Sequence, residues 1–263
     1  MHHVVMFSSG IGSWAAAKAV VATYGTENTT LLFMDTQIED DDNYRFLHEA
    51  AANTGASLQI IADGRNVFDI FKSVKFMGNS RIDPCSRILK RELADAWIAD
   101  NFTPDTVTMH VGIDWTEEHR FITLARRKLP WIYEAPLCKE PYMLTKAQML
   151  SWAEAEGLKP PRMYSYGFQH ANCGGFCIKS GQKQFKLLYQ HFPDRYLAYE
   201  QQEQSVYDHI GSQHPFLRKV INGTLTYLSM REFREQYLDP DNAIDEFDYG
   251  GCGCFSDSEE PNA

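Results

Sequence analysis

The segment Ser8-Ser9-Gly10-Ile11-Gly12-Ser13 has the composition of an anion-binding loop, and it joins an apolar stretch to an alanine-rich one. Small residues let the backbone approach an anion, and serine hydroxyls add hydrogen-bond donors. The N–H groups and the dipole of a following helix favour negative charge at this point. The G-x-x-x-x-G-K-[ST] pattern of a Walker A loop is absent. The segment predicts a phosphate-binding loop of another kind, although a tight turn with Ser13 as helix N-cap would explain the same residues.

A second segment gathers cations around one cysteine. Cys85 lies between Arg81 and Arg87, and Lys90 and Arg91 follow. If a helix begins directly after Cys85, then Arg87, Lys90 and Arg91 share one face of it. Such a patch suits a phosphate or sulfate and would lower the pKa of the Cys85 thiol, so we expect catalytic roles for Cys85 and Lys90. The alternative is a solvated basic helix face beside an inert cysteine.

Acidic residues follow the second apolar stretch of the chain. Asp35 and Thr36 stand where this stretch ends. A carboxylate there can accept hydrogen bonds from a ribose or an adenine, or hold a cation. Glu39 is a further candidate for the same role. For the run 40–42 we favour a simpler interpretation, in which acids stabilise the first turn of a helix.

Another group of polar residues follows the fourth apolar stretch. It contains Gly112, Asp114, Glu117 and Arg120. A helix start with Thr116 as N-cap explains part of this pattern. A cation such as Arg120 in a first helical turn opposes the helix dipole, so its position needs another reason, and contact with a phosphate is one. We therefore expect a catalytic role for Arg120 as well as for Cys85 and Lys90.

The cysteines form two close pairs and two single residues. Cys173 and Cys177 bracket Gly-Gly-Phe, and Cys252 and Cys254 flank one glycine. Four thiolates suit tetrahedral zinc, and three or four suit an iron–sulfur cluster such as [4Fe-4S]. The pairs therefore predict a metal centre, with free thiols as the alternative. We expect Cys138 to be structural.

Two hydrophobic periods alternate in the first half of the chain. Short apolar stretches alternate with segments of helical spacing, which predicts βαβ units and an α/β fold with a doubly wound, mainly parallel sheet. From about residue 145 the pattern is mostly helical. We expect a nucleotide-binding α/β domain at 1–144, a helical, cysteine-containing region at 145–255 and a disordered acidic tail at 256–263. The expected strands lie at 2–7, 29–36, 57–63, 105–114 and 130–137.

Composition and charge restrict the class of protein. The chain has 263 residues, 44% hydrophobic and 23% charged, with a formal net charge of −10. An acidic balance argues against broad adhesion to nucleic acid or anionic membrane. No signal peptide and no long apolar run are evident. We therefore expect a cytoplasmic protein with reduced cysteines and no membrane partner, and we expect a homo-oligomer.

The order of these motifs resembles the adenine nucleotide alpha-hydrolase (PP-loop) superfamily. Within it, the chain is most similar to phosphoadenylyl-sulfate reductases and to DNA phosphorothioation sulfurtransferases. The segment FSSGIGSWAAAK looks like the S-G-G-x-D-S loop, and MDTQIEDDDNYRFL looks like the D-T-G-x-E segment. PCSRILKRE looks like the C-x-x-x-K segment, and VGIDWTEEHR looks like the G-x-R-x-x-E-S-x-x-R segment. The likeness covers roughly residues 3–200 and implies a Rossmann-like fold of HUP type.

The resemblance also implies roles for individual residues. The nucleotide phosphates would be held by Ser8, Ser9, Gly10, Gly12 and Ser13. The adenosine and its cation would lie near Asp35, Thr36 and Glu39. Phosphate or sulfate would be bound by Arg87, Lys90 and Arg120, and the metal centre would be held in part by Cys173 and Cys177.

Some positions depart from the family pattern. The aspartate of the family loop is Gly12 here, so Asp35 or Glu39 would have to replace that carboxylate near ATP and Mg²⁺. The arginine of the fourth motif is Asp114, and a single cysteine, Cys85, replaces a pair.

Together, the residues and the resemblance predict an enzyme that uses ATP with Mg²⁺ and zinc or [4Fe-4S]. It would release AMP and pyrophosphate while adenylating, or transferring sulfur to, a nucleotide or nucleobase, and the acceptor could lie in a nucleic acid. The alternatives are a sulfonucleotide reductase and a nucleotide-binding module without catalysis.

Overall fold

A five-stranded parallel sheet forms the centre of the α/β part. The computed structural model describes residues 1–79, 82–221 and 223–251. The strand order β3-β2-β1-β4-β5, with every pair parallel, confirms the predicted doubly wound α/β fold. The strands are β1 (His2–Met6), β2 (Thr29–Asp35), β3 (Ser57–Ala62), β4 (Val107–Val111) and β5 (Ile132–Glu134).

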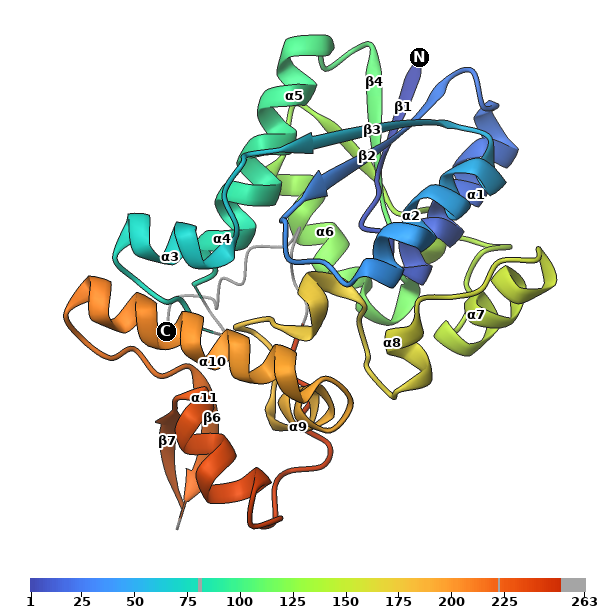
Figure 1. Ribbon diagram of the computed structural model, residues 1–263. Helices are drawn as coiled ribbons and strands as arrows, with labels where there is room; N and C mark the ends of the chain where they lie inside the picture. The colour runs from blue at the N-terminus through green and yellow to red at the C-terminus, as the bar shows by residue number, and fades with distance from the viewer. Residues whose placement is uncertain (80–81, 222, 252–263) are drawn as a thin grey trace.

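Helices cover both faces of this sheet (Figure 1). Alternate residues of a strand point to opposite faces. In β1, Val5 packs with one set of helices, whereas Val4 and Met6 pack with the other. One face carries α1 (Ile11–Tyr24), α2 (Asp41–Thr54) and α7 (Lys146–Ala155), and the other carries α5 (Leu93–Asn101) and α6 (Glu118–Arg127).

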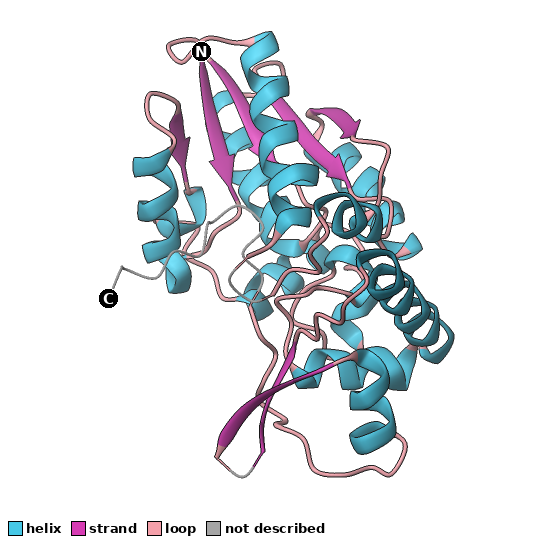
Figure 2. Ribbon diagram, turned by 90° about the vertical axis from the view of Figure 1, so that its left-hand side faces the viewer, coloured by secondary structure: helices cyan, strands magenta, loops and turns pink. Residues whose placement is uncertain are grey.

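A second layer lies beyond the carboxyl ends of the strands (Figures 1 and 2). Its core unites α3 with the C-terminal helices, and its largest fully buried side chains include Phe176, Phe185 and Phe216. The layer contains α3 (Val67–Val74), α9 (Gln182–His191), α10 (Pro193–Ile210), α11 (Met230–Phe233) and the antiparallel hairpin of β6 (Leu217–Ile221) and β7 (Thr224–Leu228). The predicted helices of the C-terminal part are confirmed. The hairpin was not predicted from the sequence.

The chain between α3 and α5 departs from a regular helix. A single turn, α4 (Pro84–Ser86), continues into a π-helical segment, Arg87–Glu92, before α5 begins. A π-helix repeats at i, i+5 rather than i, i+4. In accordance with that repeat, Arg87 pairs with Glu92 in solvent at 2.6 Å, whereas Lys90 and Arg91 are buried. The prediction that Arg87, Lys90 and Arg91 share one face is therefore wrong.

The structure shows how four helix ends are formed. Thr145 and Gln148 form a capping box at the start of α7, and Gly55 ends α2 in the left-handed conformation. Ser13 is not an N-cap, because α1 begins at Ile11. At the other site, the Asp114 carboxylate rather than the Thr116 hydroxyl accepts the capping hydrogen bond.

Four short turns complete the described structure. They are α8 (Arg162–Ser165) and the 3-10 turns Trp115–Glu117, Pro136–Cys138 and Asn172–Gly175, and a π-helical segment, Arg234–Leu238, follows α11. Within residues 1–79, 82–221 and 223–251, no helix is both long enough and apolar enough to cross a membrane.

Candidate functional site

A cavity of about 560 Å³ opens at the carboxyl edge of the sheet between β1 and β4. The strand order reverses at this point, because the chain runs from β1 towards β3 on one side and then continues at β4 on the other. Ligands of open α/β sheets bind at such switch points. The volume of the cavity is typical of a site for a small molecule.

The loop after β1 forms one wall of this cavity. Ser8, Gly10, Gly12 and Ser13 line it, as the sequence predicts for a ligand loop. Ser9 differs, because it is fully buried, has φ 55° and donates its hydroxyl to the Ser8 carbonyl. Ser9 shapes the turn and does not line the cavity. The α1 N-cap makes no side-chain hydrogen bond to the first turn of the helix, so no side chain of the cap residue covers this helix end.

Two glycines bring the loops after β1 and β4 into backbone contact. A Cβ atom added at Gly12 would lie 3.1 Å from the Gly112 carbonyl oxygen. A Cβ added at Gly112 would lie 2.8 Å from the Ser13 nitrogen and 2.9 Å from the Gly12 carbonyl carbon. A contact under 3.0 Å to backbone atoms requires the backbone to move. The close approach of the two loops therefore depends on glycine, most strictly at Gly112.

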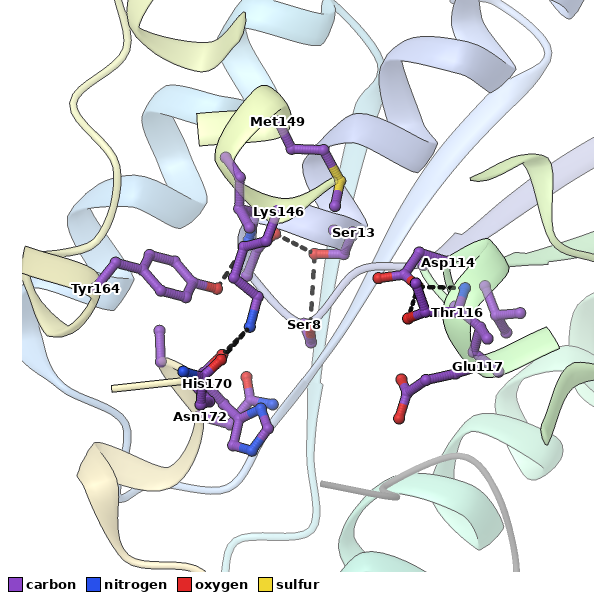
Figure 3. Close-up of a pocket in the computed structure, with 18 of the residues that line it drawn as sticks. Ser8, Ser13, Asp114, Thr116, Glu117, Lys146, Met149, Tyr164, His170 and Asn172 are labelled. Carbon is purple, nitrogen blue, oxygen red and sulfur yellow. Dashed lines mark hydrogen bonds between the residues drawn. The ribbon is translucent and has the colours of Figure 1, made fainter. Parts of the chain in front are cut away.

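The segment after β4 supplies a charged wall (Figure 3). Asp114, Thr116, Glu117 and Arg120 all line the cavity. The Asp114 carboxylate accepts from the Thr116 N–H at 2.9 Å and from its hydroxyl at 2.5 Å. Arg120 donates to Glu117. Of the three predicted catalytic residues, Arg120 is the one that lies at this site.

The third wall comes from the C-terminal half and was missed by the sequence analysis. Lys146, in the first turn of α7, lies in the cavity, with its Nζ 2.7 Å from the Gln169 carbonyl oxygen and 3.1 Å from Gln169 Oε1. Tyr164 reaches the loop after β1, and its hydroxyl accepts from the Ile11 N–H at 3.1 Å. One signal was available: like Arg120, Lys146 is a cation in a first helical turn, where the dipole disfavours it.

The predicted ligand residues after β2 do not line the cavity. The Asp35 carboxylate accepts from the Gln37 N–H and the Tyr44 hydroxyl, and burial together with this contact raises the pKa of Tyr44. Thr36 is buried and donates to Glu39 at 3.1 Å. Glu39 in turn accepts from the Cys173 N–H at 2.6 Å. Asp35 and Thr36 therefore make local contacts around this loop, whereas Glu39 links it to the distant turn at Cys173.

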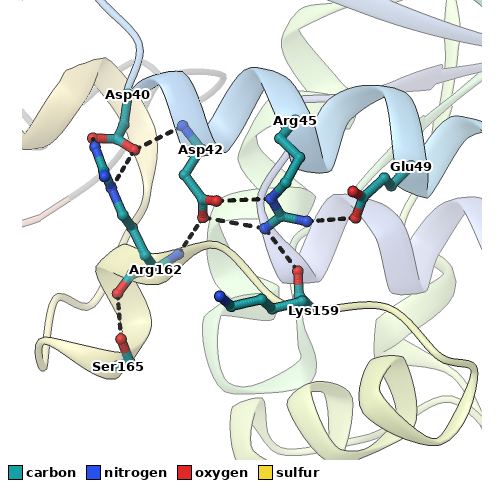
Figure 4. A network of polar contacts seen from close by, with 7 residues as sticks. All are labelled: Asp40, Asp42, Arg45, Glu49, Lys159, Arg162 and Ser165. Carbon is teal, nitrogen blue, oxygen red and sulfur yellow. Dashed lines mark hydrogen bonds and ion pairs between the residues drawn. The ribbon is translucent and has the colours of Figure 1, made fainter.

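The acidic run 40–42 does more than begin a helix (Figure 4). Asp40 is fully buried, and its carboxylate accepts from Arg162 at 2.9 and 2.8 Å and from Arg195 at 2.7 Å. Burial alone would raise the pKa of Asp40, but the hydrogen bonds from Arg162 and Arg195 outweigh it and hold this pKa below its usual value. Asp42 accepts from the Arg162 backbone N–H at 2.7 Å.

The predicted basic patch is dispersed in the structure. Arg87 is exposed beside Glu92, whereas Lys90 is buried with its Nζ 3.9 Å from Cys173 Sγ. Arg91 pairs at 3.0 Å with the buried Asp83. Cys85 is half-buried in the second layer. Arg87, Lys90 and Cys85 do not line the cavity.

Only half of the proposed metal centre belongs to the described structure. Cys173 is buried in a left-handed turn with φ 54°, and Cys177 is partly exposed, whereas Cys252 and Cys254 lie outside the described residues. Among residues 1–79, 82–221 and 223–251, no three His, Cys, Asp or Glu side chains come together in a way that could hold a metal ion. The predicted tail, 256–263, also lies outside the described residues.

Cys138 has the environment of a structural cysteine. Its thiol donates to the Ile113 carbonyl at 3.5 Å, and burial raises its pKa to about 11. A thiol with so high a pKa stays protonated and unreactive at neutral pH.

Comparison with known proteins finds a likeness in structure alone. No protein-family model matches this chain, and no curated protein matches it in sequence. The structure is similar to that of a phosphoadenylyl-sulfate (PAPS) reductase from Candida auris, crystallised as a phosphate complex. The match covers 63% of this chain and 78% of the reductase, with 15% sequence identity and a TM-score of 0.45. The chemistry of the cavity itself must therefore indicate the ligand.

Proposed function

We propose that this protein is an enzyme that binds ATP in the cavity between β1 and β4 and releases AMP and pyrophosphate while activating, or transferring sulfur to, a nucleotide or nucleobase. One observation carries the proposal. The N-terminus of α1 lies at the cavity beside Ser8, at the switch point of the sheet, whereas the buried Ser13 hydroxyl donates to the Gly10 carbonyl at 2.8 Å. This combination of N–H groups, the Ser8 hydroxyl and the helix dipole favours phosphate.

Two cations support a ligand with several negative charges. Arg120 and Lys146 come from α6 and α7, so they approach the cavity on different elements. Charge that develops on a phosphoryl group during in-line attack is stabilised by fixed cations and N–H donors. The separate origins of these two side chains suit a triphosphate better than a single phosphate.

The cavity also offers carboxylates for the cation that accompanies ATP. Gly12 supplies none in the loop, and Asp35 and Glu39 bond to other parts of the protein. Asp114 and Glu117 line the cavity, and carboxylate oxygens are the ligands that Mg²⁺ prefers. We therefore assign the Mg²⁺ of Mg-ATP to Asp114 and Glu117, where it would neutralise phosphate charge.

A zinc or [4Fe-4S] centre remains a proposal that depends on Cys252 and Cys254. The described part of the chain supplies the thiols Cys173 and Cys177, and Lys90 places a cation 3.9 Å from Cys173 Sγ. A nearby ammonium favours a thiolate. Cys173, Cys177 and Lys90 do not line the cavity, so a centre built on these thiols would be separate from the ATP site.

Ligand titration with product analysis tests the proposal. Calorimetry with Mg-ATP should give saturable binding, and incubation with candidate acceptors should yield AMP and pyrophosphate rather than ADP. Lys146→Ala should weaken ATP binding by about tenfold, as expected for loss of a charge-assisted contact. The matched control is Lys159→Ala, an exposed lysine outside the cavity. Equal affinity in the two variants would count against this site, and tight binding without turnover would favour a non-catalytic module.

A further inference from the structure

Tyr164 contacts both layers of the molecule beside the loop after β1. Its ring packs at the edge of the sheet-face core that contains Trp14 and also at the edge of the second-layer core that contains Phe176. Its hydroxyl lies in the cavity, 3.1 Å from the Ile11 nitrogen and 3.3 Å from where a Cβ of Gly10 would be (Figure 3). Two cores therefore fix the ring, and the hydroxyl is presented to the first turn of α1.

A buried ion pair fixes the short helix that carries this tyrosine. Arg162, at the start of α8, makes a two-point contact with the fully buried Asp40, and its backbone N–H donates to Asp42 (Figure 4). The Ser165 hydroxyl donates to the Arg162 carbonyl at 2.7 Å and closes the turn. An arginine fork on a carboxylate restricts orientation as well as distance. The position of Tyr164 is thus set from the start of α2.

We propose that Tyr164 is a ligand-binding residue of this site and that the Asp40–Arg162 pair positions it. A phenol oxygen can accept one hydrogen bond while its proton is donated to another group. In the complex, the Tyr164 oxygen keeps the Ile11 N–H and the hydroxyl proton is donated to a phosphoryl oxygen at the α1 N-terminus. The inference rests on the proposed function, since it needs an anionic ligand in the cavity.

Removal of the hydroxyl alone tests this role, because the ring of phenylalanine keeps the packing in both cores. The probes are Mg-ATP, inorganic pyrophosphate and adenosine. Tyr164→Phe should weaken ATP and pyrophosphate by about tenfold, as expected for a hydrogen bond to a charged group, and leave any adenosine affinity unchanged. The control is Tyr166→Phe in the same segment, where the ring stacks on His191 with 37% of the residue exposed.

The outcomes separate this inference from the proposed function. If the wild-type protein binds neither ATP nor pyrophosphate, both are overturned. If it binds them and Tyr164→Phe binds them equally well or more tightly, the Tyr164 inference alone is wrong, because the Ile11 N–H then serves the ligand better without the hydroxyl.

A double-mutant cycle tests the positioning role of Arg162. Arg162→Gln should weaken pyrophosphate binding in the wild-type background and add little to Tyr164→Phe, because the two side chains act on the same hydrogen bond. Independent, additive losses in the double variant would show that Arg162 acts on the fold and not through Tyr164. Thermal unfolding of each variant identifies any loss of binding that follows from general instability.

Discussion

The loops after β1 and β2 occupy neighbouring positions on the same edge of the sheet, yet they have opposite roles. The loop after β1 contains serine and glycine, carries no charge and borders the cavity. The loop after β2 is acidic, and Asp40 and Glu39 bond to Arg162, Arg195 and the Cys173 N–H. The loop after β1 and, in the loop after β2, Asp35, Thr36 and Glu39 were predicted to hold ligand, whereas the run 40–42 was predicted to stabilise a helix start. The comparison teaches that a run of charges in a sequence can serve the fold, whereas an uncharged loop can serve the ligand.

The largest expected effect is on stability and concerns the loop after β2. Asp40→Ala removes the shared partner of Arg162 and Arg195 and should lower the free energy of unfolding by about 3 kcal/mol, the cost of breaking a buried ion pair from one side. Asp41→Ala, at the exposed neighbouring position, should change it by less than about 0.5 kcal/mol. Chemical denaturation measures both, and equal effects would remove the distinction between Asp40 and a simple helix-start acid.

Disturbing the contact between the loops after β1 and β4 should mainly affect ligand binding. Gly112→Ala places a Cβ against the Ser13 nitrogen and the Gly12 carbonyl carbon, so the two loops must separate. We expect loss of ATP binding together with about 2 kcal/mol of stability, as for other overpacked sites. At Gly251→Ala the added Cβ meets no atom of residues 1–79, 82–221 and 223–251 within 4 Å, and this variant serves as the control. Retained ATP affinity in Gly112→Ala would contradict the assignment of this loop contact to the site.

As the pH falls, stability should first be lost at a histidine pair of the sheet and only later at Asp40 in the loop after β2. His3 and His110 form a buried pair at 3.0 Å, and burial, then the nearby His3 and Lys139, lowers the pKa of His110 to about 3. Because the unfolded chain takes up this proton near pH 6.5 and the folded protein resists it, stability falls with pH below 6.5. The expected loss from His110 is about 1 kcal/mol between pH 7 and 5.5.

The Asp40 carboxylate behaves differently on the same scale. Its pKa is held below the usual value of 3.8, so its contribution is fully present above that value and is lost only as the pH falls further. Denaturation curves at several pH values check both statements. In His110→Asn the slope between pH 7 and 5.5 should be flatter, and an unchanged slope would assign the pH dependence to other groups.

The smallest effect is expected at Arg87, which the sequence analysis assigns to phosphate binding. Arg87 and Glu92 are both about half exposed, and surface ion pairs contribute little. Arg87→Ala should change stability by less than about 0.5 kcal/mol and leave ATP affinity unaltered. Arg120→Ala, by contrast, should weaken ATP binding. A reversed order of these two affinities would move the phosphate site away from the cavity.

Sequence periodicity was sufficient for the parallel sheet, because buried strands such as residues 4–7 and amphipathic helices leave unambiguous patterns. It also located the loop at Ser8–Ser13. It could not find Tyr164, since a tyrosine at a core edge has the same local pattern whether its hydroxyl reaches a cavity or solvent. It misplaced Arg87, because a π-helical segment changes which residues share a face and has no reliable signature in composition.

The two layers are connected by the path of the chain as well as by their contacts. The described chain passes from the sheet to the second layer after β3 and returns to the sheet between Leu89 and Ala94. It crosses to the second layer again between Leu158 and Met163. Domains that close around a ligand turn about hinges, in which a few loop or element-terminal residues absorb the change in backbone angles. Three crossings, with Asp40 and Arg162 beside the third, oppose such a rotation. Ligand exchange at this cavity should therefore proceed by local movement of side chains and loops. Its rate should depend less on solvent viscosity than the rate of a whole-domain rotation would.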